Sequence, residues 1–261
     1  MIHFIHNLIR YRELILTLVG RELQARYRGT LLGYFWSLIN PLLLLTIYTV
    51  VFSTIFQPRM EGIRPYAMFL FCGLLPWTWF SGSLLESTIV LPDNAQLIKK
   101  VLFPTEILPI TKVVSHGVHF VLALPILVGA LLWTGNLGPE IFLLPVPLLL
   151  QFLFTTGIAL TLSALSVHFR DLRDLMQNLI TLWFFATPII YPLDMIQYPL
   201  LRRLIHLNPA TPLFIVYQDL SFFHRFPRWT DLAAAMVVSL VSLLVGVFLF
   251  ERLKETLMEE A

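Results

Sequence analysis

The chain has 261 residues, of which 57% are hydrophobic and only 13% are charged, and its formal net charge is +2. Soluble domains carry roughly 25% charged residues, so this composition excludes an ordinary soluble enzyme, a disordered chain and a nucleic-acid binder with a dense basic surface. We therefore expect an all-α integral membrane protein with one domain over residues 1–261.

Residues 1–30 have the pattern of an amphipathic helix. Basic and polar side chains recur at steps of three and four, and isoleucine, leucine and valine fill the other face. Such a helix lies in the membrane interface, with its basic residues toward the lipid headgroups. The pattern is compatible with a simple anchor and with a docking role.

Six stretches are long and apolar enough to cross about 30 Å of hydrocarbon, which takes about 20 helical residues each. They lie near residues 31–56, 66–91, 107–134, 141–167, 175–191 and 232–250. An even number of spans places both termini on one side of the membrane. Twelve of the 18 Lys and Arg residues lie on that side. The positive-inside rule therefore predicts that both termini are cytoplasmic.

The outer connection of residues 192–231 is far longer than the few residues that usually join packed helices, yet it is apolar. Asn208, Pro209 and Pro212 interrupt it, which predicts two short half-helices joined by a turn. Apolar helices of this length are usually re-entrant or lie flat at the interface. This outer gate region is either a lid over the outer mouth of a pathway or packing that stabilises the bundle.

Motifs for nucleotide, metal or nucleophile chemistry are absent from the sequence. It contains no P-loop, no zinc motif and no nucleophile elbow. The single cysteine, Cys72, excludes a disulfide framework, and we expect it to pack in an apolar core. For Asp171 and Asp174, each beside an arginine, a salt-bridged helix end at the membrane surface is favoured over a catalytic dyad.

Transporters driven by ions carry ionisable groups deep in the membrane. The candidates here are Glu86, Lys112, His116 and His119. We expect Glu86 and Lys112 to pair or snorkel near the cytoplasmic ends of their spans, and the histidines to form an interior hydrogen-bonded pair rather than a proton relay. The energy source is therefore expected on another polypeptide.

Several segments in chain order resemble ABC-2 type permeases of polysaccharide export, the membrane subunits of O-antigen, capsule and teichoic acid exporters. They are RELQARYRGTLLGYFWSLINP (21–41), KKVLFPTEILP (99–109), FRDLRDL (169–175), TPIIYP (187–192) and LNPATP (207–212). The resemblance implies a pore of two permease copies, driven by two copies of a cytoplasmic P-loop ATPase that binds the ATP and Mg²⁺. It implies a transport subunit that is not an enzyme and binds no cofactor or metal. The expected partners also include membrane lipids and a glycan on an undecaprenyl diphosphate carrier. Nucleic acid is not expected as a partner.

The resemblance also implies a short coupling helix that docks on the ATPase, around PDNAQLIKKVLFP (92–104). Side chains suited to a helix start precede an apolar stripe in this segment. The expected coupling residues are Asp93, Asn94, Gln96, Leu97, Ile98, Lys99, Lys100 and Val101. A solvated basic turn is the alternative.

The diphosphate of the carrier needs positive charge at the cytoplasmic interface. Arg26 and Arg28 stand there immediately before Gly29 and Gly33, and arginine offers paired donors to phosphate oxygens. The glycines would let the backbone approach closely. We expect these four residues to receive the lipid-linked diphosphate, although the positive-inside rule alone also places arginines here.

A path for a sugar polymer should combine aromatic platforms with hydrogen-bonding groups. Aromatic residues cluster in the second and fifth spans, where they could line such a path or could pack and face lipid. The candidates are Trp77, Trp79, Phe80, Trp183, Phe184, Phe185 and Tyr191.

Together these features predict the inner-membrane, multi-pass permease of an ATP-driven exporter of lipid-linked polysaccharide, with O-antigen as the expected substrate. Alternatives are an ABC-2 permease for capsule or teichoic acid, or for a drug or small lipid. A prenyl-phosphate glycosyltransferase would need acidic catalytic groups in a sizeable polar domain. A proton-coupled flippase would need His116 or Glu86 and would work without ATP.

Overall fold

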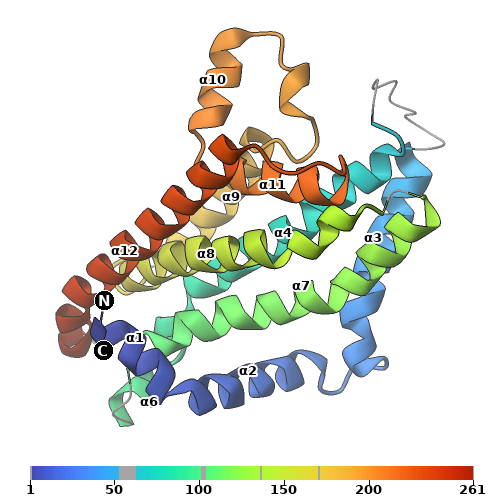
Figure 1. Cartoon of the computed structure of the whole chain (residues 1–261). Helices are drawn as coiled ribbons and strands as arrows, with labels where there is room; N and C mark the ends of the chain where they lie inside the picture. The colour runs from blue at the N-terminus through green and yellow to red at the C-terminus, as the bar shows by residue number, and fades with distance from the viewer. Residues whose placement is uncertain (1, 53–62, 101–103, 136, 170, 261) are drawn as a thin grey trace.

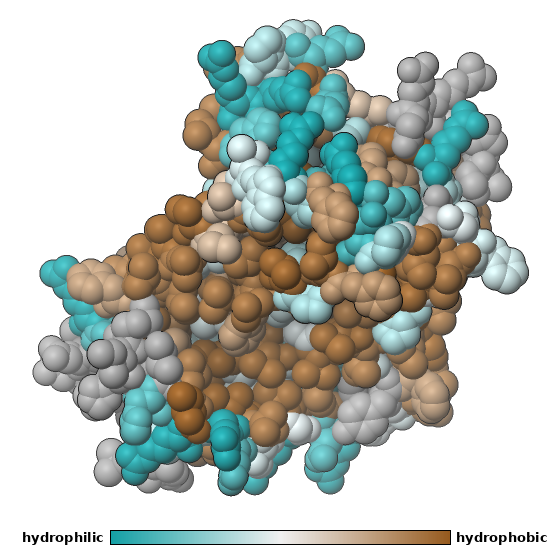
Figure 2. Space-filling model, viewed as in Figure 1, coloured by the Kyte–Doolittle hydropathy of each residue, from teal (hydrophilic) through white to brown (hydrophobic). Residues whose placement is uncertain are grey.

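The computed structural model describes residues 2–52, 63–100, 104–135, 137–169 and 171–260. Within these ranges the regular secondary structure is helical throughout. Hydrophilic residues gather at two opposite ends of the molecule, and a hydrophobic belt lies between them (Figure 2). This distribution is the one expected of a chain whose middle lies in hydrocarbon.

The helices follow one another along the chain. In chain order they are α1 (Ile2–Arg10), α2 (Arg12–Tyr27), α3 (Trp36–Val50), α4 (Tyr66–Ser87), α5 (Val90–Asp93), α6 (Ala95–Lys100), α7 (Ile107–Trp133), α8 (Pro145–Leu165), α9 (Leu172–Ala186), α10 (Pro199–Leu207), α11 (Thr211–Ser221) and α12 (Trp229–Glu260). Short 3-10 helices are η1 (Gly33–Phe35), η3 (Pro139–Leu143) and η4 (Leu193–Met195). Helices α1, α2 and α6 lie at one end of the bundle and α10 lies at the other (Figure 1). We call these the α2 end and the α10 end.

Among the described residues, four helices are long and apolar enough to cross a membrane: α4, α7, α8 and the Trp229–Leu253 part of α12. They correspond to the second, third, fourth and sixth predicted spans. Helix α3, in the first predicted span, is apolar but shorter. Helix α9 ends at Ala186, before the predicted end at residue 191, because Thr187 is extended, with ψ of 137°, ahead of Pro188.

The N-terminal segment differs from the single helix expected over residues 1–30. It forms two helices, α1 and α2, with a change of backbone conformation at Tyr11 (φ −101°, ψ 17°). The hydrogen bonds Tyr11 N to Asn7 O and Ile15 N to Tyr11 O bridge the change. Polar residues can keep their spacing of three and four across such a local change in the backbone. The sequence pattern therefore did not predict the division at Tyr11. Ile15 and Val19 of α2 are buried with Ile107 at the start of α7.

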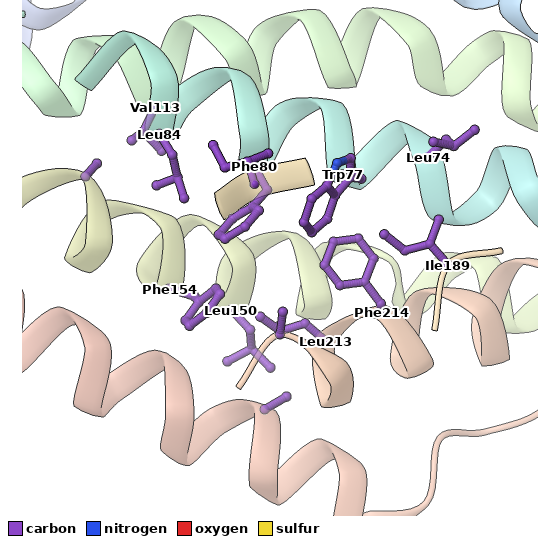
Figure 3. Close-up of a cluster of buried hydrophobic side chains, with 14 of the residues drawn as sticks. Leu74, Trp77, Phe80, Leu84, Val113, Leu150, Phe154, Ile189, Leu213 and Phe214 are labelled. Atoms are coloured by element: carbon purple, nitrogen blue, oxygen red, sulfur yellow. The ribbon is translucent and has the colours of Figure 1, made fainter. Parts of the chain in front are cut away.

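Helix α4 is the centre of the bundle. In an apolar stretch of 18 residues of α4, 78% is buried inside the protein. In the corresponding stretch of α12 only 22% is buried, so this helix exposes an apolar surface. A large core cluster contains Trp77 and Phe80 of α4, Phe154 of α8 and Phe214 of α11 (Figure 3). Cys72, also on α4, is buried in a neighbouring apolar cluster, as expected.

Helices α8 and α12 pack through glycine. A methyl group placed on Gly157 would overlap the backbone of Ser242 and Leu243, and one placed on Gly246 would overlap the backbone of Gly157. Ser242 Oγ donates a hydrogen bond to Phe154 O at the same crossing, at 2.9 Å. Small residues thus let the two backbones touch, as in other membrane helix pairs.

Candidate functional site

A cluster of ionisable side chains joins α2, α4 and α7 at the α2 end. Lys112 Nζ contacts a carboxylate oxygen of Glu22 and lies 3.3 Å from Glu86 Oε2, so the expected pairing of Glu86 with Lys112 is confirmed. Arg26 Nη2 lies 2.7 Å from Glu86 Oε1. Charges of alternating sign therefore connect the N-terminal helix α2 to two helices of the bundle.

His116 belongs to the same cluster. Its Nε2 lies 3.0 Å from Glu86 Oε1, and its ring meets that of His119 edge to face, with centroids 6.3 Å apart. Gly82 of α4 makes room for His116, because a Cβ at Gly82 would lie 2.5 Å from the imidazole. The histidine pair is thus present as a ring contact, and His116 also faces a carboxylate.

A cavity of about 590 Å³ lies between α2, α3, α4 and α7 beside this cluster. Its size is in the range of small-molecule sites. It combines a guanidinium and imidazoles with hydroxyl and amide groups and with aromatic rings. The lining residues are Arg26, Thr30, Trp36, Ser37, Asn40, Pro41, Leu44, Leu75, Thr78, Trp79, His116, His119, Phe120 and Ala123. Such a wall suits a ligand with a negative group and a hydroxyl-rich part.

Of the four residues expected at the diphosphate, the structure brings only Arg26 to this cavity. Arg28 is exposed and follows the last residue of α2. Gly29 and Gly33 have left-handed φ values of 76° and 51°, which other residues rarely adopt. The Gly33 N–H donates to Thr30 Oγ1 at 3.1 Å. The glycines therefore shape the turn from α2 into η1.

The coupling segment forms two short helices, α5 and α6, at the α2 end. Asn94 stands between them, and its side-chain Nδ2 donates back to Val90 O at 2.8 Å. Leu97 is 38% exposed, whereas Ile98 packs against a cluster that contains Phe4. Asp93 and Gln96 are exposed. Lys99 and Lys100 end α6, nothing is described of their side chains, and Val101 lies outside the described residues.

The expected path aromatics on α4 are covered by protein. Trp77 and Phe80 are 5% and 1% exposed, and their rings contact Phe184, Phe214 and Phe154 (Figure 3). In this chain they pack helices together, which is one of the two roles expected of them. Their neighbour Trp79 is also buried, donates from Nε1 to Val113 O at 2.9 Å and forms part of the cavity wall.

The aromatics of the fifth predicted span lie closer to the surface. Phe185 is 57% exposed. Trp183 and Phe184 are half-buried at the edge of the core cluster. Tyr191 Oη donates to Phe185 O at 2.7 Å. Among the expected path residues, Phe185 therefore presents the most open ring.

Residues 187–192 are irregular, and side chains from other elements satisfy their carbonyls. Gln218 Nε2 donates to Pro188 O at 2.7 Å, and Tyr66 Oη donates to Ile190 O at 2.6 Å. Buried backbone groups need such partners. The roles of Tyr66, Gln218 and Glu22 were not expected from the sequence. Polar side chains next to apolar stretches were the available signal for Tyr66 and Gln218, whereas Glu22 stands among other polar residues in RELQARYR.

Asn208, one of the expected gate residues, ties the turn between α10 and α11 to the end of α9. Its Nδ2 donates to Ala186 O and Thr187 Oγ1, at 2.9 and 3.0 Å. Its Oδ1 accepts from Trp183 Nε1 at 2.7 Å and from the Ala210 N–H at 3.0 Å. Pro209 and Pro212 flank Ala210 and Thr211, and Pro212 is in the first turn of α11. The predicted break between two short helices is thus present here.

Replacing Asn208 with alanine is expected to lower the stability of the protein by about 2 kcal/mol, because several partly buried partners lose their hydrogen bonds. Thermal unfolding of the purified protein in detergent measures the effect. Asn178→Ala is the control, because the Asn178 amide is exposed and donates within its own helix, to Asp174 O at 3.1 Å, one turn back on α9. Equal melting temperatures for the two variants would contradict this role for Asn208.

Comparison with known proteins decides the family. The family described as ABC-2 type transporter matches residues 13–222. The chain belongs to this ABC-2 family. It is 39% identical over 261 residues to the "O-antigen export system permease protein RfbA" of Myxococcus xanthus, with 99% of each chain covered. It is 32% identical over 251 residues to the RfbA of Klebsiella pneumoniae, with 95% of each covered.

A more distant relative is named for a different substrate. This ABC-2 chain is 23% identical over 244 residues to the "Polysialic acid transport protein KpsM" of Escherichia coli, which covers 91% of this chain and 92% of the relative. The recognised family is therefore confirmed along nearly the whole length. The matched residues include nearly all of α2, the ionic cluster and helices α10 and α11.

Proposed function

We propose that this chain is the membrane-spanning permease subunit of an ATP-driven exporter that carries lipid-linked O-antigen from the cytoplasm across the inner membrane. The observation that carries the proposal is the 39% identity, over 99% of both chains, to a protein named as an O-antigen export permease. The apolar belt between two polar ends agrees with this function (Figure 2).

In this proposal the chain crosses the membrane six times, with α3 and α9 as the two shorter spans. The α2 end faces the cytoplasm together with both termini, and α10 and α11 are the re-entrant helices of the outer gate. Two copies form the pore, and the weakly covered face of α12 meets lipid or the second copy. Two copies of a P-loop ATPase bind ATP and Mg²⁺ and dock on α5 and α6.

The diphosphate of the carrier lipid would bind at the cavity beside Arg26. The Arg26 guanidinium is 42% exposed and is held by Glu86, so phosphate oxygens can compete with Glu86 for its donors. Lys112 and His116 would then remain to balance the carboxylate. The aromatic and hydroxyl-bearing wall, with Trp79 and Thr78, would contact the first sugars. Arg28 would stand outside the cavity and meet lipid phosphate.

A complementation experiment tests this function. Deleting the gene should leave O-antigen on its carrier inside the cell, and the wild-type chain should restore surface O-antigen and co-purify with a P-loop ATPase. The double variant Arg26→Gln, Arg28→Gln should restore about tenfold less surface O-antigen, the loss expected when charge-assisted hydrogen bonds to phosphate are removed.

The control removes the same charge from the exposed surface of α2 by changing Arg12 and Arg21 to Gln. It should export normally at equal protein level and equal ATPase assembly. Normal export by the Arg26 and Arg28 variant would reject the diphosphate site. Normal surface O-antigen in the deletion strain would reject the O-antigen function.

Capsule export is the second candidate, favoured by the likeness to the polysialic acid transport protein. A strain that loses capsule and keeps O-antigen would support it. A proton-coupled flippase is the more distant alternative, favoured by the contact of His116 with Glu86. Transport that persists when the ATPase is inactivated would support that alternative.

A further inference from the structure

A second cavity, of about 370 Å³, lies at the α10 end of the chain. Its wall comes from η4 and the segment before it, from α10, from α11 and from the segment that leads into α12. Apart from Ile63, its wall therefore belongs to the outer gate region, and the cavity shares no lining residue with the one beside Arg26. Polar residues in this part of the molecule form the hydrophilic end seen in Figure 2.

Asp219 of α11 is the unusual residue in this wall. Its side chain is 1% exposed, and its Oδ1 accepts from Arg225 Nε at 2.8 Å and lies 2.7 Å from Arg225 Nη2. Its Oδ2 is buried and has no hydrogen-bond partner in the described part of the chain. A buried carboxylate oxygen without a donor is costly, so this atom is positioned to accept from a ligand.

Burial raises the pKa of Asp219, although Arg225 opposes the shift. The carboxylate thus has less hydrogen bonding and solvation than an exposed aspartate has. A ligand that donates a hydrogen bond to Asp219 Oδ2 would supply the interaction that this oxygen lacks.

The rest of the wall restricts the chemistry of that ligand. Arg225, 4.8 Å above the Phe223 ring, and Arg228 offer donors, while Ile215 and Phe223 offer apolar surface. A free anion would meet the carboxylates of Asp194, Asp219 and Asp231 in the same wall. A purely apolar ligand would leave Asp219 Oδ2 unpaired. Among the described residues, no cluster of three or more His, Cys, Asp or Glu side chains could hold a metal ion.

A sugar ring meets all of these conditions. Its hydroxyl groups both donate, as Asp219 Oδ2 requires, and accept, as the guanidinium groups require. Its C–H faces pack on aromatic and aliphatic side chains. The volume lies within the usual range for small-ligand sites. We propose that this outer cavity binds a sugar unit of a polyhydroxylated chain, with Asp219 Oδ2 as the hydroxyl acceptor.

This inference rests on the proposed function only for the source of the sugar, which would be the polysaccharide leaving the membrane. Binding there would place a sugar between α10 and α11 as the chain emerges. Sugar binding to the purified protein can be measured without any export, so the two proposals can fail separately.

The test uses the purified full-length chain in lipid nanodiscs. Saturation-transfer NMR would probe methyl glycosides of glucose, galactose, mannose, rhamnose and N-acetylglucosamine, with inorganic diphosphate as the anionic probe. We expect at least one glycoside to bind and Asp219→Asn to bind it about tenfold more weakly, since a hydrogen bond to a charged group is lost.

A second variant guards against misfolding at Asp219. Ile215→Phe narrows the cavity and leaves the Asp219–Arg225 pair in place, and it should also abolish the glycoside signal. Asp174→Asn, an exposed carboxylate in the first turn of α9, is the matched control and should bind as the wild type does.

Several outcomes would overturn the proposal: no glycoside bound by the wild type, equal binding by both cavity variants and the control, or displacement of the glycoside by diphosphate. Sugar binding that survives in a protein that exports no O-antigen would leave this site standing and remove the proposed function.

Discussion

Gly157→Ala is expected to destabilise the protein by about 3 kcal/mol, the upper end of the usual cost of overpacking. The reason is that the added methyl group meets the backbone of Ser242 and Leu243, which cannot move aside as a flexible side chain can. Helices α8 and α12 would have to separate, and the hydrogen bond from Ser242 to Phe154 O would be lost with their contact. Thermal unfolding in detergent and the yield of folded protein measure the effect.

Gly129→Ala is the matched control for this substitution. Gly129 is also in a helix, α7, and a methyl group there would meet nothing within 4 Å. Because alanine is favoured over glycine in a helix by about 1 kcal/mol, this variant should be neutral or slightly more stable. The two variants should therefore shift the melting temperature in opposite directions. A shift of the same sign and size in both would show that α8 and α12 do not depend on close backbone contact.

Lys112→Met is expected to loosen α2 from the bundle and to lower stability by about 2 kcal/mol. Lys112 lies between two carboxylates, and removing it leaves them without their shared cation. Glu86 would keep Arg26 and His116 nearby, whereas Glu22 would keep the hydrogen bond from Ser115 Oγ, at 3.1 Å. Most of the cost should therefore come from Glu22. Faster hydrogen exchange in α2 would report the loosening.

A double variant separates loss of charge pairing from loss of packing. Adding Glu22→Gln to Lys112→Met removes the stranded charge and should restore about half of the lost stability, because the pair is coupled. Arg21→Gln on the exposed surface of α2 is the control and should leave exchange unchanged. The contradicting outcome is additivity: Glu22→Gln lowers the free energy of unfolding by the same amount in the Lys112→Met background as in the wild type. In that case the ion pair does not hold α2 against the bundle.

Composition and residue order determined the class of this protein. Low charge and long apolar stretches indicated a helical membrane protein, since apolar residues in such number can be covered only by lipid or by one another. Four of the predicted spans contain helices that are long and apolar enough to cross a membrane. The ordered segments from RELQARYRG to LNPATP indicated the ABC-2 family, to which the chain belongs.

Proline and asparagine also located the outer turn from the sequence. Asn208 stands between α10 and α11, where Pro209 follows the end of α10 and Pro212 lies in the first turn of α11. The pairing of Glu86 with Lys112 could be expected for a similar local reason, since a charged residue in an apolar span needs a partner.

The tertiary structure alone decided which side chains meet across the bundle. Periodicity places a residue on a helix face and does not say which helix covers that face. For this reason only the structure shows that Trp77 and Phe80, for which path-lining and packing were both open, lie in the core, and that Arg26 and not Arg28 lines the first cavity. Gly157, Glu22 and Asp219 acquire their importance only from neighbours distant in sequence, because backbone contact, shared charge and an unpaired buried oxygen are properties of packing.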